Sequence, residues 1–213
     1  MPSRARTLAF VCLIAAVDTG AQTNAWRRCL ADTSPRAIDA CTSVISLNPH
    51  NDGAFVNRGI AYRRIGDVDS AIRDYDEAIR LNPQAADAFN NRGNAFRTRD
   101  EPERAIRDYD EAIRLDPHYA HAFNNRGIIF LERGDADRAI VDFSVAIAEE
   151  TSYANAFRNR GLARVQQGSF DLAIADFDEA FRLNPAIGHG IEYGLALEGR
   201  DAAQSGTDDS DDR

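Results

Sequence analysis

The sequence predicts an all-α fold, an α-solenoid of helix-turn-helix repeats closed by a C-terminal capping helix. The main observation is a string that recurs at a fixed interval, as AIRDYDEAIRLNP, AIRDYDEAIRLDP, AIVDFSVAI and AIADFDEAFRLNP. These copies begin at Ala71, Ala105, Ala139 and Ala173, each 34 residues after the one before. A second string, AFxNRG, precedes each copy with the same step. A fixed period of this length is typical of stacked helical units rather than of one globular core.

Composition excludes some functional classes. The formal net charge is −9, and a nucleic-acid binder needs a basic face, so we expect no nucleic-acid partner. Every basic residue is Arg, so no site can depend on an ammonium group. The sequence contains no Gly-rich phosphate loop, nucleophile elbow or zinc-spaced Cys set. We therefore expect no enzyme active site and no cofactor.

The first 21 residues, Met1 to Ala21, have the pattern of a secretory signal peptide. Arg4 and Arg6 precede an apolar run, Leu8–Val17, and small residues follow before Gln22. The run is shorter than the ~20 apolar residues that span a bilayer. We expect export, to the periplasm of a Gram-negative bacterium, with no membrane insertion after cleavage. An uncleaved signal anchored in the inner membrane is the alternative.

Residues 22–51 form a degenerate first hairpin. Leu47-Asn48-Pro49 matches Leu81-Asn82-Pro83 of the first full repeat. The alignment places Cys29 and Cys41 on facing helices. In an exported chain, two such cysteines predict a disulfide, which would stabilise the hairpin that has no earlier repeat to pack on. Two buried free thiols are the alternative.

Residues 52–185 then contain four full repeats of two helices each, 52–85, 86–119, 120–153 and 154–185. In the first of these, Phe55, Gly59 and Tyr62 form a stripe at helical spacing, and a second stripe runs from Ala71. Gly66-Asp67 separates the helices, and Pro83 ends the second one. A small residue at Gly59 allows the two helices to approach closely.

These residues resemble the tetratricopeptide repeat (TPR) family, whose members form a right-handed superhelix. The family pattern of a large residue, Gly, aromatic, Ala, aromatic, Ala and Pro is met at Phe55, Gly59, Tyr62, Ala71, Tyr75, Ala78 and Pro83, and it recurs through Pro185. Three departures are local. Asp100-Glu101-Pro102 replaces the Gly-Asp turn and Thr151 replaces Pro, which we expect to change two loops. Arg164 takes an aromatic position, which we expect to loosen the last hairpin.

The C-terminal segment predicts two elements. Residues 186–200 carry Ile187, Ile191 and Leu195 at a spacing of four, which indicates a capping helix over the last repeat. Residues 201–213 are rich in Asp and Ser without an apolar pattern, which predicts a disordered acidic tail. Its aspartates could hold calcium, but a solubilising role is the simpler interpretation.

Charged and metal-binding residue types recur mainly with the repeat. Arg92 and Asp108, with their equivalents in the other repeats, are expected to pair at a partly buried seam. His118 and His121 form the one close histidine pair, and no third His or Cys accompanies them. A metal site needs three or four ligands, so we expect none.

The TPR resemblance implies where a partner would bind. In the family the first helices line a concave groove, and asparagines there contact the main chain of a bound peptide. The resemblance implies a groove floor of Asn90, Asn91, Asn94, Asn125, Arg158 and Asn159. Amides suit this role because each offers donors and an acceptor. An alternative is that these asparagines only shape the helix starts.

The resemblance also excludes one mode of binding. Family members that dock chaperones grip a terminal carboxylate with lysines, and this chain has none. Val56 and Ile60 occupy the positions where that clamp begins. We therefore reject docking of a chain terminus in this way.

Two functional hypotheses remain. The first is a non-enzymatic scaffold or adaptor that binds a peptide or protein segment in the groove. The second is a structural component of an envelope assembly, contacted through its convex face or ends. The sequence does not predict the partner's identity or the oligomeric state.

Overall fold

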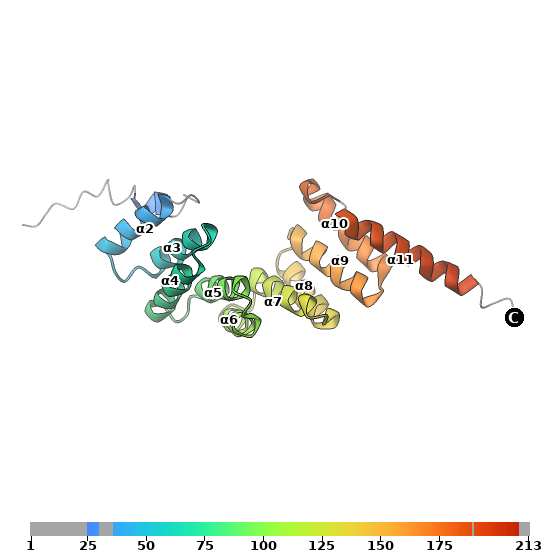
Figure 1. Cartoon of the computed structure of the whole chain (residues 1–213), viewed down its shortest axis with the longest axis horizontal. Helices are drawn as coiled ribbons and strands as arrows, with labels where there is room; N and C mark the ends of the chain where they lie inside the picture. The colour runs from blue at the N-terminus through green and yellow to red at the C-terminus, as the bar shows by residue number, and fades with distance from the viewer. Residues whose placement is uncertain (1–24, 30–35, 189, 209–213) are drawn as a thin grey trace, which may run out of the picture.

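The computed structural model describes residues 25–29, 36–188 and 190–208, which are helical apart from turns and contain no strand. Residues 25–29 and α2 (Arg36–Leu47) precede four hairpins that follow one another along the molecule (Figure 1). The hairpins are α3 (Asp52–Arg64) with α4 (Val68–Leu81), α5 (Ala86–Thr98) with α6 (Pro102–Leu115), α7 (Ala120–Glu132) with α8 (Ala136–Glu149), and α9 (Ala154–Gln167) with α10 (Phe170–Leu183). A 3-10 turn, η1 (Pro185–Ile187), leads to α11 (Gly190–Asp208). The predicted all-α solenoid is confirmed.

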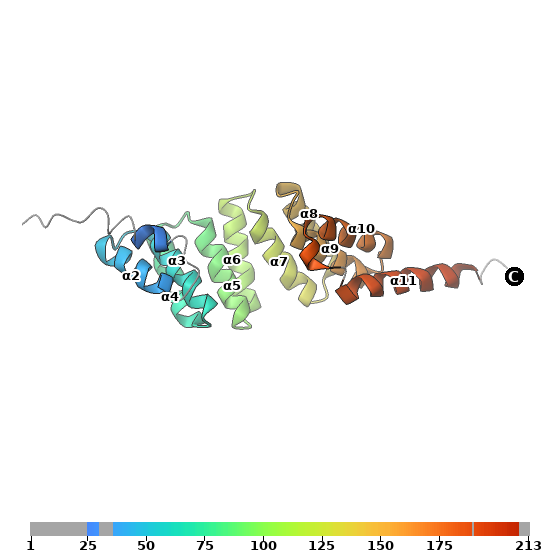
Figure 2. The ribbon, with the colours of Figure 1, turned by 90° about the horizontal axis from the view of Figure 1, so that it is seen from above.

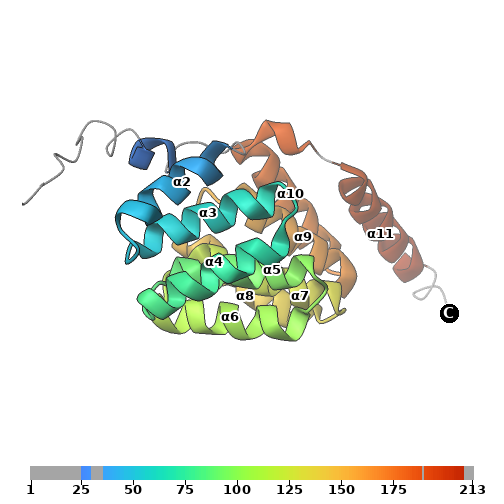
Figure 3. The same ribbon diagram turned by 60° about the vertical axis from the view of Figure 1, so that its left-hand side comes forward.

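The hairpins wind into a superhelix whose inner surface is formed by the first helices. Helices α3, α5, α7 and α9 contact one another in succession, whereas the second helices make their main contacts with the first helices on either side. The first helices are therefore the more closely spaced set. Figure 2 shows the hairpins stacked in order, and Figure 3 shows them winding about the long axis with α11 to one side.

Each hairpin is held together by an aromatic ring packed against a glycine, as the repeat predicts. A Cβ atom at Gly59 would lie 2.6 Å from Cε1 of Tyr75, and one at Gly93 would lie 2.6 Å from Cε1 of Tyr109. Both tyrosines are fully buried. Because no real Cβ contact is this short, the position requires glycine.

The turns within and between the hairpins correct two predictions. Gly66, Gly134 and Gly168 have positive φ angles of 85°, 79° and 81°. Asp100 occupies the equivalent position with a φ of 58°, so the expected change of this loop does not occur. Aspartate is among the few residues other than glycine that enter the left-handed region. Pro102 then starts α6, where its missing N–H costs no hydrogen bond. At Thr151 the turn also keeps its form, since Tyr153 N–H donates to the Glu150 carbonyl as Tyr119 N–H does to Asp116.

A ladder of arginines joins the two helices of each hairpin, as the seam hypothesis predicts. In each repeat an Arg of the first helix donates two hydrogen bonds of 2.7–3.0 Å to both carboxylate oxygens of an Asp in the second helix. The pairs are Arg58–Asp74, Arg92–Asp108, Arg126–Asp142 and Arg160–Asp176. All four aspartates are buried. The two-pronged geometry is one that arginine provides and lysine does not.

The same arginines also reach back to the preceding hairpin. Nη1 of Arg92 donates to Asp76 at 2.6 Å, and Nη1 of Arg126 donates to Asp110 at 2.6 Å. The hydrogen bonds to Asp142 raise the pKa of Arg126, while burial acts in the opposite direction. Each of these arginines is therefore shared between two repeats and stays charged at the seam.

The N-terminal hairpin contains a disulfide. The sulfur atoms of Cys29 and Cys41 are 2.11 Å apart, and both residues are buried. Val44 and Ala54 pack against them, which joins α2 to the first full repeat. The structure thus has the predicted bond in place of two free thiols. The predicted signal peptide, residues 1–21, lies outside the described residues.

The C-terminal helix differs from its prediction in extent and in orientation. The expected disordered tail begins at Asp201, but α11 continues to Asp208, because Ala202, Ala203 and Gln204 favour a helix. The predicted stripe of Ile191 and Leu195 faces solvent. The exposed fraction is 82% for Ile191 and 51% for Leu195. Residues 209–213 lie outside the described residues.

Helix α11 packs against the last hairpin through Ala196, Gly199 and Tyr193 instead of through Ile191 and Leu195. Ala196 is fully buried, and the Tyr193 ring meets Phe177 edge-on with the ring centroids 6.3 Å apart. Small residues form this surface because α11 lies close to the last hairpin. A Cβ atom at Gly199 would lie 2.4 Å from the Phe170 ring.

Arg164 does not leave a gap in the last hairpin. Its Nη1 donates to Asp176 at 2.7 Å and to the Leu172 carbonyl at 3.2 Å. An ion pair thus replaces the aromatic contact of the other repeats. Among the described residues, no helix combines the length and apolar character needed to cross a membrane.

Candidate functional site

The six predicted groove residues all lie on the first helices, which form the inner surface of the superhelix. Asn90, Asn91 and Asn94 are on α5, and Asn125 is on α7. Arg158 and Asn159 are on α9. The structure therefore places them on the first helices of three successive repeats. Their hydrogen bonds, described below, divide them into two groups.

Four of the six bond to a neighbouring repeat or to α11. Nδ2 of Asn125 donates to Oδ1 of Asn90 at 2.9 Å, which joins α7 to α5. Nδ2 of Asn159 donates to Oδ1 of Asn124 at 3.0 Å, which joins α9 to α7. Arg158 pairs with Glu192 of α11 at 2.5 Å. These side chains therefore help to hold the superhelix together.

Two of the asparagines in these bonds between repeats, which we call the asparagine ladder, are almost inaccessible to solvent. Asn90 is 5% exposed and Asn124 is 4% exposed. Asn124 was absent from the predicted groove, although the 34-residue period places it at the position of Asn90. A buried amide satisfied by its neighbour serves packing rather than recognition. This explanation differs from the helix-start alternative, because the bonds join separate repeats.

Asn91 and Asn94 have other partners. Nδ2 of Asn91 donates to the Asp87 carbonyl of its own helix at 2.8 Å. Oδ1 of Asn94 accepts from the Tyr109 hydroxyl at 2.9 Å. Both asparagines are partly exposed. Of the six predicted residues, Asn91 is the one whose bonds reach no other helix, which makes it the most available to a partner.

Two tyrosines that the sequence analysis did not single out, Tyr119 and Tyr153, lie beside this surface with His121. Nδ1 of His121 is 2.9 Å from the Tyr153 hydroxyl, and their rings meet at 84°. The Tyr119 hydroxyl is 3.5 Å from Nδ2 of Asn90. Burial raises the pKa of Tyr119 to about 12. Tyr119 and Tyr153 are 34 residues apart, and the period could have identified them.

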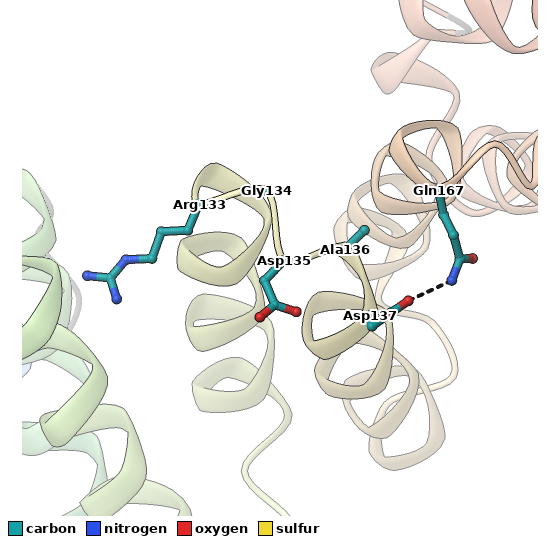
Figure 4. Close-up of a pocket in the computed structure, with 6 residues that line it drawn as sticks. All are labelled: Arg133, Gly134, Asp135, Ala136, Asp137 and Gln167. Carbon is teal, nitrogen blue, oxygen red and sulfur yellow. Dashed lines mark hydrogen bonds between the residues drawn. The ribbon is translucent and has the colours of Figure 1, made fainter.

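The pocket drawn in Figure 4 belongs to a different part of the molecule. It has a volume of about 430 Å³ and lies at the turn between α7 and α8, where Arg133 and Gly134 line it. On its far side Gln167 Nε2 donates to Asp137 at 2.7 Å. Similar turn-to-turn bonds join the earlier hairpins, for example Arg99 to Asp69. The pocket is therefore the open space beside a structural contact.

No metal centre emerges from the described residues. Within them, no group of three or more His, Cys, Asp or Glu side chains could hold a metal ion. The predicted histidine pair is divided between two partners, because Nδ1 of His118 lies 2.9 Å from Glu149 and His121 meets Tyr153. Both histidines lie at the junction between the second and third repeats.

The fold defines a helical-repeat protein whose first helices form the inner surface of a superhelix. The chain belongs to the tetratricopeptide repeat family, whose model matches residues 56–119, 91–155 and 126–187. Proteins of this family are generally non-catalytic scaffolds for protein interactions. No curated protein matches the chain.

Several solved structures share the fold. A crystal structure of MamA is 27% identical, with 76% of this chain and 94% of that chain covered and a TM-score of 0.63. TTC0263, a protein of Thermus thermophilus, is 19% identical, with 83% and 98% covered and a TM-score of 0.68. PilF of Pseudomonas aeruginosa is 16% identical, with 87% and 86% covered and a TM-score of 0.71. The last two similarities concern the fold alone.

Proposed function

We propose that this protein is a scaffold that binds an extended peptide or protein segment along the inner surface of its first helices. The observation that carries the proposal is the difference between the two faces of the hairpins. The first helices carry amides in register from one repeat to the next, at Asn57, Asn91, Asn125 and Asn159, whereas the second helices contain no asparagine. Side chains of this kind offer donors and acceptors to a peptide main chain.

The available part of this surface is narrower than the sequence predicted. Asn90, Asn125 and Asn159 are used in the ladder between repeats, and Arg158 holds α11. Asn57 and Asn91, at equivalent positions of the first two repeats, are partly exposed and bond to no other helix of the described chain. We therefore assign the main-chain contacts of a bound peptide to Asn57 and Asn91.

The bacterial envelope is the compartment that we propose for this interaction. The N-terminal 21 residues have the charge and apolar pattern of a secretory signal. The Cys29–Cys41 disulfide supports an oxidising compartment, because such bonds persist mainly in exported proteins.

Affinity capture from an envelope extract tests this function. Wild type is compared with the double variant Asn57→Ala and Asn91→Ala, with partners quantified by mass spectrometry. The matched control is Arg73→Ala with Arg107→Ala, two exposed residues of the second helices. We expect a partner held by wild type and by the control to be lost from the asparagine variant, provided that it keeps its helical circular dichroism spectrum. Equal capture by all three would contradict groove binding.

The structural alternative has an observation of its own. Val141 of α8 and Leu172 of α10 are 62% and 54% exposed on the second helices. If the protein is a component of an envelope assembly contacted on this side, Val141→Asp and Leu172→Asp would abolish capture. Our proposal predicts that these two changes leave capture intact.

A further inference from the structure

The first full repeat contains two neighbouring polar side chains that are not fully satisfied within the chain. Among the described residues, Nε of Arg63 and the hydroxyl of Tyr75 are buried and have no hydrogen-bond partner. Arg63 lies in the last turn of α3, and no carboxylate of the described residues pairs with it. Buried polar groups are normally satisfied, so each exception calls for a physical reason.

The two groups are neighbours. Burial raises the pKa of Tyr75 to about 12, and the adjacent Arg63 guanidinium acts in the opposite direction. Arg64, the next residue, is exposed and contributes positive charge to the same place. The end of α3 is therefore a local basic site in a chain whose formal net charge is −9.

The other repeats show what this position looks like when it is satisfied. In the second repeat, Tyr109 donates to Asn94 at 2.9 Å and Arg97 pairs with Glu132 at 3.1 Å. In the third and fourth repeats both polar groups are replaced by apolar residues. The four sets are Ile60, Arg63 and Tyr75; Asn94, Arg97 and Tyr109; Ile128, Leu131 and Phe143; Leu162, Val165 and Phe177.

The first repeat thus keeps both donors and lacks the acceptor. Ile60 stands at the position where Asn94 of the next repeat accepts the hydrogen bond of the Tyr109 hydroxyl. Arginine can only donate hydrogen bonds, and its charge favours a negative partner. The missing group is therefore an acceptor that carries negative charge and arrives from outside the chain.

We propose that Arg63 and Tyr75 bind the side-chain carboxylate of an Asp or Glu residue in the peptide that lies along the first helices. The inference rests on the proposed function and specifies the chemistry of its partner. Arg63 is partly exposed, so its outer nitrogen atoms meet the carboxylate first. No hydrogen bond holds Nε of Arg63, so the side chain can turn toward the ligand and uncover the Tyr75 hydroxyl as the second donor.

The occupant is an internal acidic side chain rather than a chain terminus. The positions Val56 and Ile60, where a clamp for a terminal carboxylate begins in the family, are apolar here. Ligands blocked at both ends therefore serve as the probe, because they carry no terminal charge.

Two pools of decapeptides, acetylated and amidated at their ends, make the test. They share random sequences and differ only at the fifth residue, which is Glu in one pool and Gln in the other. The immobilised chain is incubated with both, and bound peptides are quantified by mass spectrometry. We expect the best binders to favour Glu by about tenfold or more, the range of a charge-assisted hydrogen bond.

Variants connect this preference to the two residues. Arg63→Gln is expected to remove the preference, and Tyr75→Phe to reduce it several-fold. Arg107→Gln, a change at an exposed arginine of α6, is the matched control and should leave it intact. Circular dichroism melts confirm that each variant is folded.

The outcomes separate the two proposals. Binding of both pools without preference, or a preference that survives Arg63→Gln, would overturn the carboxylate site and leave the groove function standing. A preference unchanged by Tyr75→Phe would remove Tyr75 from the site. Absence of any binding to the wild-type chain would overturn the groove function and the site together.

Discussion

The first and second full repeats have almost the same second helix but differ in what their first helices present. The strings AIRDYDEAIRLNP and AIRDYDEAIRLDP differ at one residue, and Tyr75 and Tyr109 are equally buried against a glycine. On the first helices, Ile60 stands in one repeat where Asn94 stands in the other. That exchange leaves one tyrosine hydroxyl without a partner and satisfies the other. The core is thus constant, and the surface chemistry changes through single first-helix residues.

The largest expected effect on stability comes from the Arg–Asp pair that the two repeats share. Arg92→Ala would leave the buried Asp108 carboxylate without its partner, which we expect to cost about 3–5 kcal/mol of unfolding free energy. Arg58→Ala should act in the same direction on Asp74. Urea unfolding followed by circular dichroism measures both.

A control separates this seam from surface ion pairs. Arg114 pairs with Glu111 on the exposed face of α6, where such pairs contribute little. Arg114→Ala should therefore leave the unfolding midpoint nearly unchanged. If Arg92→Ala were as mild as Arg114→Ala, the seam would not hold the repeats together.

The second prediction concerns the N-terminal hairpin, which packs against the first full repeat. Reduction of the Cys29–Cys41 bond should cost about 2–3 kcal/mol of local stability, because the unfolded hairpin regains chain entropy. Hydrogen exchange should then accelerate in α3 and remain unchanged in α7. Alkylation of both cysteines in the unreduced chain, detected by intact mass, would show that the bond is absent.

The third prediction compares the cores directly. Gly59→Ala and Gly93→Ala each place a Cβ atom 2.6 Å from a tyrosine ring carbon, and overpacking of this kind costs about 1–3 kcal/mol. The two changes should lower the melting temperature by similar amounts. Gly66→Asn, at a turn with positive φ and open space, should be much milder. A clear difference between the two Ala variants would mean that the two cores are not equivalent.

The smallest expected effect is a pH dependence at the junction of the second and third repeats. Glu149 raises the pKa of the exposed His118 above its ordinary value of 6.5. A raised pKa stabilises the fold in full below pH 6.5, and this contribution is lost as pH rises through the folded-state pKa. The melting temperature at pH 5.5, taken relative to that at pH 8.5, should therefore be slightly lower in His118→Gln than in wild type. An equal pH dependence in both would show that this contact does not contribute.

Much of the fold could be predicted because the repeat applies the same rules four times. The pairing of Arg92 with Asp108 and the packing of Gly59 against Tyr75 follow from residues that recur with the helical period. The turn at Asp100 could not be read in this way, because aspartate tolerates the left-handed backbone that glycine usually supplies. The length of α11 was missed because its Ala-rich residues were grouped with the acidic tail.

The candidate site was harder to predict than the fold. Its asparagines follow the period, but which of them are free depends on how closely successive repeats pack. Asn125 reaches Asn90 across 35 positions, one more than the period, so the bond depends on the pitch of the superhelix. The unpartnered Tyr75 hydroxyl depends on Ile60 in the adjacent helix, and this neighbour relation becomes visible only in three dimensions.

The most direct test of the difference between the two repeats is a pair of thermal melts. Tyr75→Phe removes a hydroxyl that has no partner, so we expect the melting temperature to stay the same or to rise. Tyr109→Phe removes the donor to Asn94, so we expect a loss of about 1 kcal/mol and a lower melting temperature. Equal losses in both variants would mean that the Tyr75 hydroxyl is satisfied within the chain. The first repeat would then hold no vacant donor for a ligand.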